Sequence, residues 1–524
     1  VSYEAAPAFD PAMRAHPPGP LPLLWFGLYP APVRLAALPD DGGAFSASGW
    51  TPELSRDDYD AAIARIKAYI AAGETYQVNY TLRLRARLAG SAWAFFLALT
   101  RAQRGHYGAW VHLGSHILCS ASPELFFRLE GDVITCKPMK GTARRGLWWE
   151  DDRARARELA HSAKNRAENV MIVDMVRNDL GRIAKTGSVR VTRLCDVERY
   201  ATVWQMTSTV TARTRAAYPE LFQALFPCAS ITGAPKVHTT ALIAGLETSP
   251  RDAYTGAIGW LAPGRKAQFT IAIRTAQVDV ATGELEYGTG GGIVWDSAAE
   301  SEYDEALTKT LVLTQRRPEF RLLETLRWRP GRGYDLRHGH LRRLRRSADY
   351  FGFTVDLDAV RARLEGEAPV EPVPHRVRLL VAEHGAIEIQ ATPLPETEKR
   401  VWRVALAPEP VDPADPFLYH KTTHRAVYAA ARAAHPEADD VLLWNPRGEL
   451  TEATIATLAV RLDGRWLTPP IACGLLPGVM RAHLLRRGVL TEAVITRAML
   501  AAAEEIALIN SVRGWLPAEL MPQL

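Results

Sequence analysis

Cysteine is scarce in this sequence and long apolar runs are absent. The five cysteines are scattered over 524 residues without a Cys-x-x-Cys pair, which argues against a disulfide framework or a structural zinc site and favours a reducing cytoplasm. No stretch approaches the roughly 20 consecutive apolar residues of a membrane helix, and no secretion signal opens the chain. Because the first residue is Val1 rather than methionine, an incomplete N-terminus is one expectation.

Concentrated charge of either sign is absent as well. The formal net charge is +5 with 23% charged residues, and the arginines are spread along the chain, so nucleic acid is a poor default partner. The densest basic run, residues 336–353, places Leu341, Leu344, Ala348 and Phe351 at helical spacing and predicts a helix with one buried face. With 47% hydrophobic residues, the chain is long enough for about two to four soluble domains.

Lysine is scarce beyond Pro318, where only Lys399 and Lys421 remain. A helical pattern ends just before this point, and two arginines and a proline follow it. This change of composition predicts a domain boundary. We therefore expect one domain at residues 1–316 and a second at 317–524.

Several elements of the first part can be predicted from periodicity. Residues 55–73 read as a helix that begins at the cap residue Ser55 and stops at Gly73. The following stretch, TYQVNYTLRLRA, alternates polar and apolar residues, which predicts a half-buried strand with Gln77 on its polar face. Residues 156–182 predict one long helix closed by Gly181, and residues 301–313 predict another helix.

Two glycine-rich segments, SITGAPK at residues 230–236 and YGTGGGIVWDS at 287–297, are predicted as turns between strands. Such a turn can be simply flexible, or it can offer backbone amides to an anion. Glu302 and Glu305 share one helical face, which is usually solvated. Together with Glu168 from another helix, they also form a set of oxygen ligands that magnesium accepts when water and substrate complete it.

The motifs of the first part occur in the order of a known family. GETYQVNYT, ASPELFF, CKPMKGTARRG, AENVMIVDMVRNDLGR, LFPCASITGAPK, YTGAIGW, FTIAIRT, GTGGGIVWDS and SEYDEALTK run from about residue 50 to 315. In this order they resemble the chorismate-utilising enzymes. That group includes anthranilate synthase component I, aminodeoxychorismate synthase component I, and the isochorismate and salicylate synthases.

The resemblance implies a fold and a binding site. It implies an α+β domain of packed antiparallel sheets with outer helices. Glu168, Glu302 and Glu305 would be ligands of a Mg²⁺ ion that holds the ring carboxylate of chorismate. The implied contacts to the rest of the substrate are Thr232, Tyr254, Arg274, Lys309 and the amides of Gly290, Gly291 and Gly292.

Two residues discriminate within the family. Relatives that add water carry a lysine base where this chain has Gln77, and glutamine cannot deprotonate water at neutral pH, so ammonia is the expected nucleophile. Anthranilate synthases usually have alanine where this chain has Lys140, whereas aminodeoxychorismate synthases have lysine. A single lysine is far more often a surface residue than a catalytic one, so this assignment rests on the surrounding motif.

A lysine at this position has a specific use. Its amine would attack C2 of chorismate and expel the C4 hydroxyl by an allylic shift; ammonia would then add at C4 and expel the lysine. Burial and the neighbouring cations Lys137, Arg144 and Arg145 would favour the neutral amine of Lys140 by lowering its pKa.

The chain departs from the family in places. Gln205 stands where many relatives have a histidine, which leaves open what protonates the departing hydroxyl. Asn165 stands where some relatives have an acidic residue, which implies a smaller set of metal ligands. The sequence has no glutaminase nucleophile motif, so a separate glutamine amidotransferase subunit or free ammonium would supply ammonia.

The second part resembles the class IV pyridoxal phosphate enzymes through FRLLETLRW, LRHGHLRRLRRSADYFGF, LYHKTTHRAVYAAAR, LLWNPRGELTEATIATLAV, LLPGVMR and EIALINSVRGWLPA. This implies a two-lobed α/β domain in which Lys421 carries the cofactor and Glu452 faces its pyridine nitrogen. The implied phosphate contacts are Arg343, Val479, Met480, Ser511 and Val512.

The two resemblances together predict a bifunctional enzyme that makes 4-aminobenzoate, a folate precursor, from chorismate and ammonia. HKTTHR is closer to the lyase pattern than to the branched-chain aminotransferase pattern, and the product of the first domain would be the lyase substrate. The alternatives are anthranilate formation with an attached aminotransferase, or a second domain that only binds or dimerises. Because class IV relatives commonly dimerise, a homodimer is expected.

Overall fold

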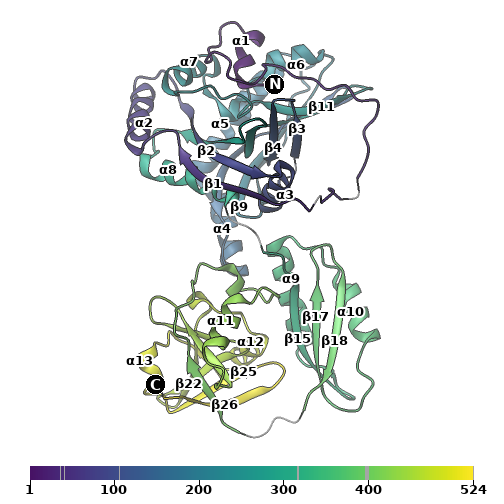
Figure 1. Cartoon of the computed structure of the whole chain (residues 1–524), viewed down its shortest axis with the longest axis vertical. Coiled ribbons are helices and arrows are strands. Elements are labelled where there is room, and N and C mark those ends of the chain that lie inside the picture. Colours follow the sequence, from purple (N-terminus) through teal and green to yellow (C-terminus); the bar gives the residue numbers. More distant parts are fainter. Residues whose placement is uncertain (36, 41, 106, 315–317, 396–399, 523–524) are drawn as a thin grey trace. The chain divides into compact units, whose positions relative to one another are not determined.

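The computed structural model describes residues 1–35, 37–40, 42–105, 107–314, 318–395 and 400–522. The chain divides into two compact units (Figure 1): Val1–Arg145 with Arg155–Arg317, and Gly146–Ala154 with Pro318–Leu524. The predicted boundary at residues 316 and 317, and Lys399, lie outside the described residues. Within the described part, no helix is long and apolar enough to cross a membrane. All five cysteines are buried free thiols.

Two seven-stranded antiparallel sheets form the scaffold of the first unit. The first has the order β1-β2-β14-β13-β4-β3 with β10 beside β2, and its strands are Phe45–Pro52, Gln77–Gly90, Glu284–Ile293, Thr275–Asp279, His116–Ser122, Tyr107–His112 and Gly233–Ala234. The second has the order β11-β12-β5-β6-β9-β7 with β8 beside β9, and its strands are Ala257–Ala262, Lys266–Ile271, Leu125–Glu130, Val133–Lys137, Val203–Arg213, Met139–Arg144 and Arg190–Arg199.

Helices bury the apolar faces of these sheets. Helices α2, α7 and α8 share one core with β2 and β14, α3 packs on the same sheet in another core, and α5 and α6 pack on the second sheet. This arrangement confirms the α+β class. Helices α1 to α8 lie at Ala6–Phe9, Arg56–Ala71, Ala92–Gln103, Trp149–His161, Ala163–Gly181, Tyr218–Leu225, Lys236–Leu246 and Ala299–Thr308. The first residues of α4 belong to segment Gly146–Ala154 of the second unit, and the other helices lie within the first unit.

Some predicted elements form as expected and others do not. The helix predicted over residues 301–313 is α8, which already ends at Thr308. Ser55 caps α2, with its hydroxyl accepting from the Asp58 amide. The single helix predicted over residues 156–182 is wrong, because Ser162 ends α4 and caps α5 by accepting from the Asn165 amide; serine favours this capping position.

The glycine turn predicted at residues 287–297 is also wrong. Its glycines lie inside strand β14, paired with β2. They are needed for close approach rather than for turning: a Cβ at Gly290 would lie 2.2 Å from the Tyr80 carbonyl oxygen, and one at Gly288 would lie 2.2 Å from the Tyr254 ring.

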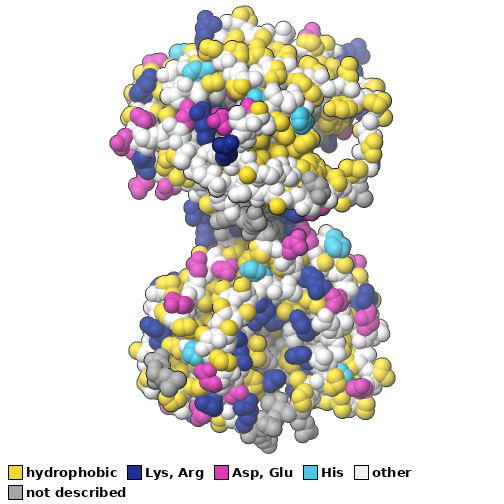
Figure 2. Space-filling model, in the orientation of Figure 1, with side chains coloured by type: hydrophobic (Ala, Val, Ile, Leu, Met, Phe, Trp, Pro, Cys, Tyr) yellow, Lys and Arg dark blue, Asp and Glu magenta, His cyan; other side chains and the backbone are white. Residues whose placement is uncertain are grey.

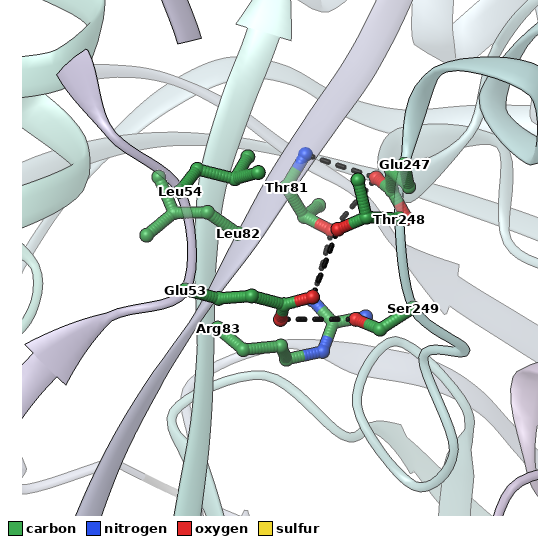
Figure 3. A pocket seen from close by; sticks show the side chains of 8 residues that line it. All are labelled: Glu53, Leu54, Thr81, Leu82, Arg83, Glu247, Thr248 and Ser249. Atoms are coloured by element: carbon green, nitrogen blue, oxygen red, sulfur yellow. Dashed lines mark hydrogen bonds between the residues drawn. The ribbon is translucent and has the colours of Figure 1, made fainter. Parts of the chain in front are cut away.

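The polar face of β2 is buried, whereas the sequence predicted a half-buried strand. Gln77 is 1% and Arg83 2% exposed. Figure 3 shows why the middle of this face tolerates burial: the Thr81 amide and hydroxyl both donate to Glu247, at 2.9 and 2.7 Å, and Arg83 Nη1 donates to Thr81 Oγ1 at 3.0 Å. Arg251 in turn pairs with Glu247 at 2.7 Å. A small pocket of about 170 Å³, open solvent included, adjoins this network.

The surface of the first unit carries mixed charge and some exposed apolar groups. Basic and acidic side chains are interspersed on the face shown in Figure 2. Among the described residues of 17–44 there is no helix or strand. This segment includes the exposed side chains of Phe26, Leu28, Tyr29 and Val33.

The second unit has two sheets, each in its own lobe. The first lobe has the antiparallel order β16-β15-β17-β18, at Gly333–Tyr334, Leu322–Arg329, His375–Val381 and Ile387–Pro393, with α9 and α10 at Arg337–Phe351 and Leu357–Gly366. The second lobe has a mixed sheet of order β21-β20-β19-β26-β25-β22-β23-β24. Its strands are Leu450–Ala453, Asp440–Trp444, Trp402–Leu406, Gly514–Leu520, Glu505–Asn510, Thr457–Leu462, Arg465–Thr468 and Thr491–Glu492, and its helices α11 to α13 are Ala426–Ala434, Val479–Arg486 and Arg497–Leu500. The two-lobed α/β class is thus confirmed.

Segment Gly146–Ala154 belongs to the second unit although it follows β7 of the first. The Trp148 ring stacks on the Tyr419 ring, with centroids 5.4 Å apart. Glu150 forms an ion pair with Arg346 at 2.7 Å. The second unit therefore takes part of its packing from a segment far away in the sequence.

Candidate active sites

Lys140 lies on β7 of the second sheet, and its amine reaches the first sheet. An ideal Cβ at Gly292 would lie 2.7 Å from Lys140 Nζ and 2.1 Å from Gln77 Nε2, so both groups crowd the backbone of β14. Both polar atoms of the Gln77 side chain are buried and have no hydrogen-bond partner among the described residues. Buried polar groups are normally paired, so this amide marks a place where a ligand or water binds.

The ammonium form of Lys140 is disfavoured. Burial lowers the pKa of Lys140, although Glu168 and Glu124 oppose the shift, and Lys309 contributes to it. Two of the cations that were predicted to lower this pKa bind other groups. Lys137 donates to Glu198 at 2.8 Å, and Arg145 Nη1 donates to the Tyr200 carbonyl at 2.9 Å.

Glu124 is a functional candidate that the sequence analysis missed. It is 4% exposed and accepts from the Ser230 hydroxyl at 2.7 Å and from the Met139 amide at 3.3 Å. Burial raises the pKa of Glu124 to about 7, although the hydrogen bond from Ser230 and the charge of Lys140 oppose the rise. The signal for it was an acidic residue inside the apolar motif ASPELFF.

Lys309 lies beside Gly290 and Gly291 of strand β14, and Arg274 contacts Lys309. Lys309 Nζ donates to the Gly290 carbonyl at 2.8 Å and pairs with Glu305 at 2.8 Å. Arg274 Nη1 donates to the Lys309 carbonyl. A Cβ at Gly291 would lie 3.2 Å from Glu302 Oε2 and 3.8 Å from Lys309 Nζ. The structure therefore brings together most of the anchors implied by the resemblance.

The three predicted magnesium ligands share one electrostatic environment. Burial raises the pKa of Glu168; Lys140 opposes this, and Glu302 and Glu305 add to it. Glu302 accepts from the Ser297 hydroxyl at 2.6 Å. Within the described residues, no group of three or more His, Cys, Asp or Glu side chains is arranged to hold a metal ion. Magnesium commonly uses one or two carboxylates with water and substrate, so a site that these glutamates complete together with chorismate does not need three ligands already in place.

Two predicted substrate contacts are engaged with the protein itself. The Thr232 hydroxyl donates to the carbonyls of Cys228 at 3.1 Å and Ala229 at 3.4 Å. Tyr254 packs against Gly288, and the Arg83 guanidinium lies 5.1 Å from the centre of its ring.

Lys421, in the second unit, is held between the two lobes. Its carbonyl accepts from the Leu323 amide of β15 at 3.0 Å. Burial, together with Arg343 and Arg425, lowers the pKa of Lys421 to about 8. A lysine with a lowered pKa is suited to forming a covalent bond with an aldehyde.

Glu452 is the second titratable group of this site. It accepts from the Tyr428 hydroxyl at 2.7 Å and from the Leu476 amide at 3.2 Å. Burial raises the pKa of Glu452 to about 7. Arg425 lies over the Tyr428 ring, 4.3 Å from its centre. Neither Tyr428 nor Arg425 was predicted from the sequence.

The predicted phosphate contacts are placed around the start of α12. Arg343 Nη1 donates to the Pro477 carbonyl at 3.2 Å, two residues before the first helical amides, those of Val479 and Met480. A first helical turn has amides without intrahelical partners, which suits an anion. The Ser511 hydroxyl reaches the Thr325 carbonyl at 3.5 Å.

Two details of this phosphate site were not predicted. The Val512 amide donates to Asn510 Oδ1 at 3.0 Å. Arg343 is also oriented by the buried Glu324, at 2.7 Å. An amine of lowered pKa, a buried carboxylate and a helix start beside an arginine fit pyridoxal phosphate.

The folds and sites define an enzyme with a separate amine-bearing site in each unit. Residues 1–315 match the family described as chorismate binding enzyme, and the chain belongs to this family. Residues 321–520 match the family described as amino-transferase class IV. The chain is thus a chorismate-binding domain followed by a class IV aminotransferase-like domain.

Individual relatives match one unit at a time. Aminodeoxychorismate synthase component 1 of Salmonella typhimurium is 41% identical over 264 residues, which is 50% of this chain and 58% of that protein. Anthranilate synthase component I of Streptococcus pneumoniae is 30% identical, with a TM-score of 0.48, over 52% of this chain and 60% of that one. The 4-amino-4-deoxychorismate lyase of Pseudomonas aeruginosa is 24% identical, with a TM-score of 0.35, over 39% of this chain and 83% of that one. The chain thus spans little more than half the length of the synthase it matches.

Proposed function

We propose that the protein converts chorismate and ammonia to 4-amino-4-deoxychorismate in its first unit, and then releases pyruvate to give 4-aminobenzoate in its second. The observation that carries the proposal is the meeting of the Lys140 amine and the unpartnered Gln77 amide at Gly292. The 41% identity to a protein named aminodeoxychorismate synthase component 1 supports it.

Each group of the first site has a task in this reaction. The neutral amine of Lys140 attacks C2 of chorismate, the two conjugated ring double bonds shift, and the C4 hydroxyl leaves as water after accepting a proton from Glu124. Ammonia then adds at C4, the two double bonds shift back, and the bond from C2 to nitrogen breaks so that Lys140 leaves as the neutral amine. The ammonium group formed at C4 gives up one proton, which restores Glu124 to its acid form. A carboxyl group with a pKa of about 7 is suited to donating this proton at neutral pH.

The remaining groups of the first site would neutralise the negative charges of the substrate. Chorismate is a dianion, and Arg274 and Lys309 would bind its carboxylates. We propose that Glu168, Glu302 and Glu305 hold a Mg²⁺ ion with water and the ring carboxylate, where the ion would neutralise one substrate charge. Calorimetric titration of chorismate with and without Mg²⁺ tests this: equal affinity in both would contradict it.

In the second unit, Lys421 and Glu452 would hold pyridoxal phosphate at its aldehyde and pyridine ends, and α12 with Arg343 would hold its phosphate. The bound cofactor would supply an electron sink for the bond changes that release pyruvate. Lys421 Nζ would move the proton between substrate and site. An absorbance at about 410–430 nm that borohydride bleaches would distinguish this from a domain that only binds or dimerises.

We further propose a cytoplasmic enzyme that receives ammonia from a separate glutamine amidotransferase subunit and dimerises through the second unit. A product assay tests the main proposal: purified protein is given chorismate and ammonium, and 4-aminobenzoate is separated from 2-aminobenzoate. Formation of 2-aminobenzoate alone would assign anthranilate chemistry instead. Lys140→Ala in the same assay tests the covalent step, because unchanged formation of aminodeoxychorismate would exclude it.

A further inference from the structure

Strand β7 contains a bulge at the residue that carries the amine. Lys140 and Gly141 together face the single residue Met206 on β9. A bulge of this kind bends the strand and redirects a side chain. Gly141 has a φ of +90°, which a residue with a Cβ rarely adopts. The bulge therefore sets the direction in which Lys140 leaves the strand.

Side-chain amides hold both carbonyls of this bulge. Gln205 Nε2 donates to the Gly141 carbonyl at 2.9 Å, and Gln205 Oε1 accepts from the Thr142 hydroxyl at 3.0 Å. Asn169 Nδ2 donates to the Lys140 carbonyl at 3.3 Å. The two peptide groups on either side of Gly141 are thereby fixed from two neighbouring elements, β9 and α5.

The two amides differ in what else depends on them. Asn169 is 1% exposed and also accepts from the Ser208 hydroxyl at 2.5 Å, so its loss would disturb the core. Gln205 is half-buried, and its side-chain amide makes hydrogen bonds to two residues of the bulge strand, Gly141 and Thr142. Glutamine donates and accepts through one planar group, whereas glutamate only accepts and methionine, of similar length, does neither well.

We propose that Gln205 is a positioning residue that locks the β7 bulge and thereby aims the Lys140 amine at the backbone of Gly292. Gln205 acts through the carbonyl of Gly141 and not on the substrate. The inference rests on the proposed role of Lys140 as a nucleophile, and it adds a determinant of where that nucleophile lies. Misplacing a reacting group by about 1 Å can slow a reaction about 100-fold.

Steady-state kinetics of the full-length protein with chorismate and ammonium test the proposal. Gln205→Met should lower kcat about 10- to 100-fold and leave the KM for chorismate within about threefold, because the binding groups are untouched. Gln205→Glu keeps the acceptor for Thr142 but loses the donor to Gly141, so it should resemble Gln205→Met. Gln268→Met on β12 of the same sheet is the matched control and should leave both constants unchanged.

A second readout does not need turnover. An amine-reactive reagent labels lysines, and peptide mass spectrometry follows Lys140 with and without saturating chorismate. In the parent protein and in Gln268→Met, bound chorismate should protect Lys140. In Gln205→Met the protection should fall to less than about half, because the amine no longer lies against the substrate. The exposed Lys266 serves as the internal reference.

The outcomes separate this inference from the proposed function. If Lys140→Ala retains the parent rate, the covalent step fails whatever Gln205 does. If Lys140→Ala is inactive but Gln205→Met keeps its kcat within about twofold and full protection of Lys140, the positioning role alone is overturned. A raised KM with unchanged kcat would assign Gln205 to substrate binding and would also overturn it.

Discussion

Glu124→Gln should raise the free energy of unfolding of the first unit relative to the parent above pH 4.5 and should lower the rate of amination. Burial raises the pKa of Glu124 from 4.5 to about 7. Each pKa unit corresponds to about 1.4 kcal/mol, so ionising this carboxyl inside the fold costs about 3 kcal/mol. A raised carboxyl pKa means that the folded state holds its proton longer than the unfolded state. The stability contribution is therefore complete below pH 4.5 and is lost as the pH rises to about 7.

Glutamine at this position cannot ionise but can still accept from Ser230 and Met139. The difference in the free energy of unfolding, variant minus parent, should therefore grow by about 3 kcal/mol between pH 4.5 and pH 8. Over the same range, amination at saturating chorismate and ammonia should be slower by about 10²- to 10⁴-fold, because the proton donor for the departing hydroxyl is gone.

Two assays decide this prediction. Denaturant unfolding at several pH values gives the first quantity, and initial rates at constant free ammonia give the second. Glu130→Gln, an exposed glutamate on β5, is the matched control and should change neither. An unfolding difference that is flat with pH would refute the buried ionisation, and an amination rate within about threefold of the parent would refute the proton-donor role.

Three further outcomes follow from the geometry. Gly292→Ala puts a Cβ 2.1 Å from Gln77 Nε2 and 2.7 Å from Lys140 Nζ, so amination should fall about 10- to 100-fold while the borohydride-sensitive absorbance of the second unit remains. Amine-reactive labelling of Lys421 in cofactor-free protein should rise with a midpoint near pH 8; a midpoint near 10 would contradict its lowered pKa. Glu324→Gln should destabilise the second unit by about 3–5 kcal/mol in denaturant unfolding, because it leaves the buried guanidinium of Arg343 uncompensated, and a stability equal to that of the parent would count against this ion pair.

Ordered motifs and periodicity predicted the architecture well. The capped helix after Ser55 and the amphipathic helix over residues 336–353 could be predicted because caps and apolar spacing are local properties of the sequence. The packed antiparallel sheets were predicted only through the resemblance carried by the ordered motifs. Burial of the polar face of β2 could not be predicted from the sequence. It depends on Glu247 and Arg251, which satisfy Thr81 and Arg83 from a distant segment of the chain.

In the candidate sites, too, the contacts made by distant segments of the chain could not be predicted from the sequence. The motif around Lys140 identified the amine, and burial lowers its pKa as the sequence predicted, but the contributing cation is Lys309 and not the adjacent cations that the sequence suggested. Lys309 is a remote residue that β14 brings near. Glu124 was missed because a glutamate in an apolar motif has no marked chemistry until the surrounding fold excludes water.

The two lysines resemble each other in their electrostatics although their units have unrelated folds. Each amine has its pKa lowered by burial, and each has a buried glutamate, Glu124 or Glu452, among the groups that oppose the shift. Burial raises the pKa of both glutamates to about 7. Burial favours the neutral form of both partners, so one physical effect acts on the amine and on the carboxyl group of each site.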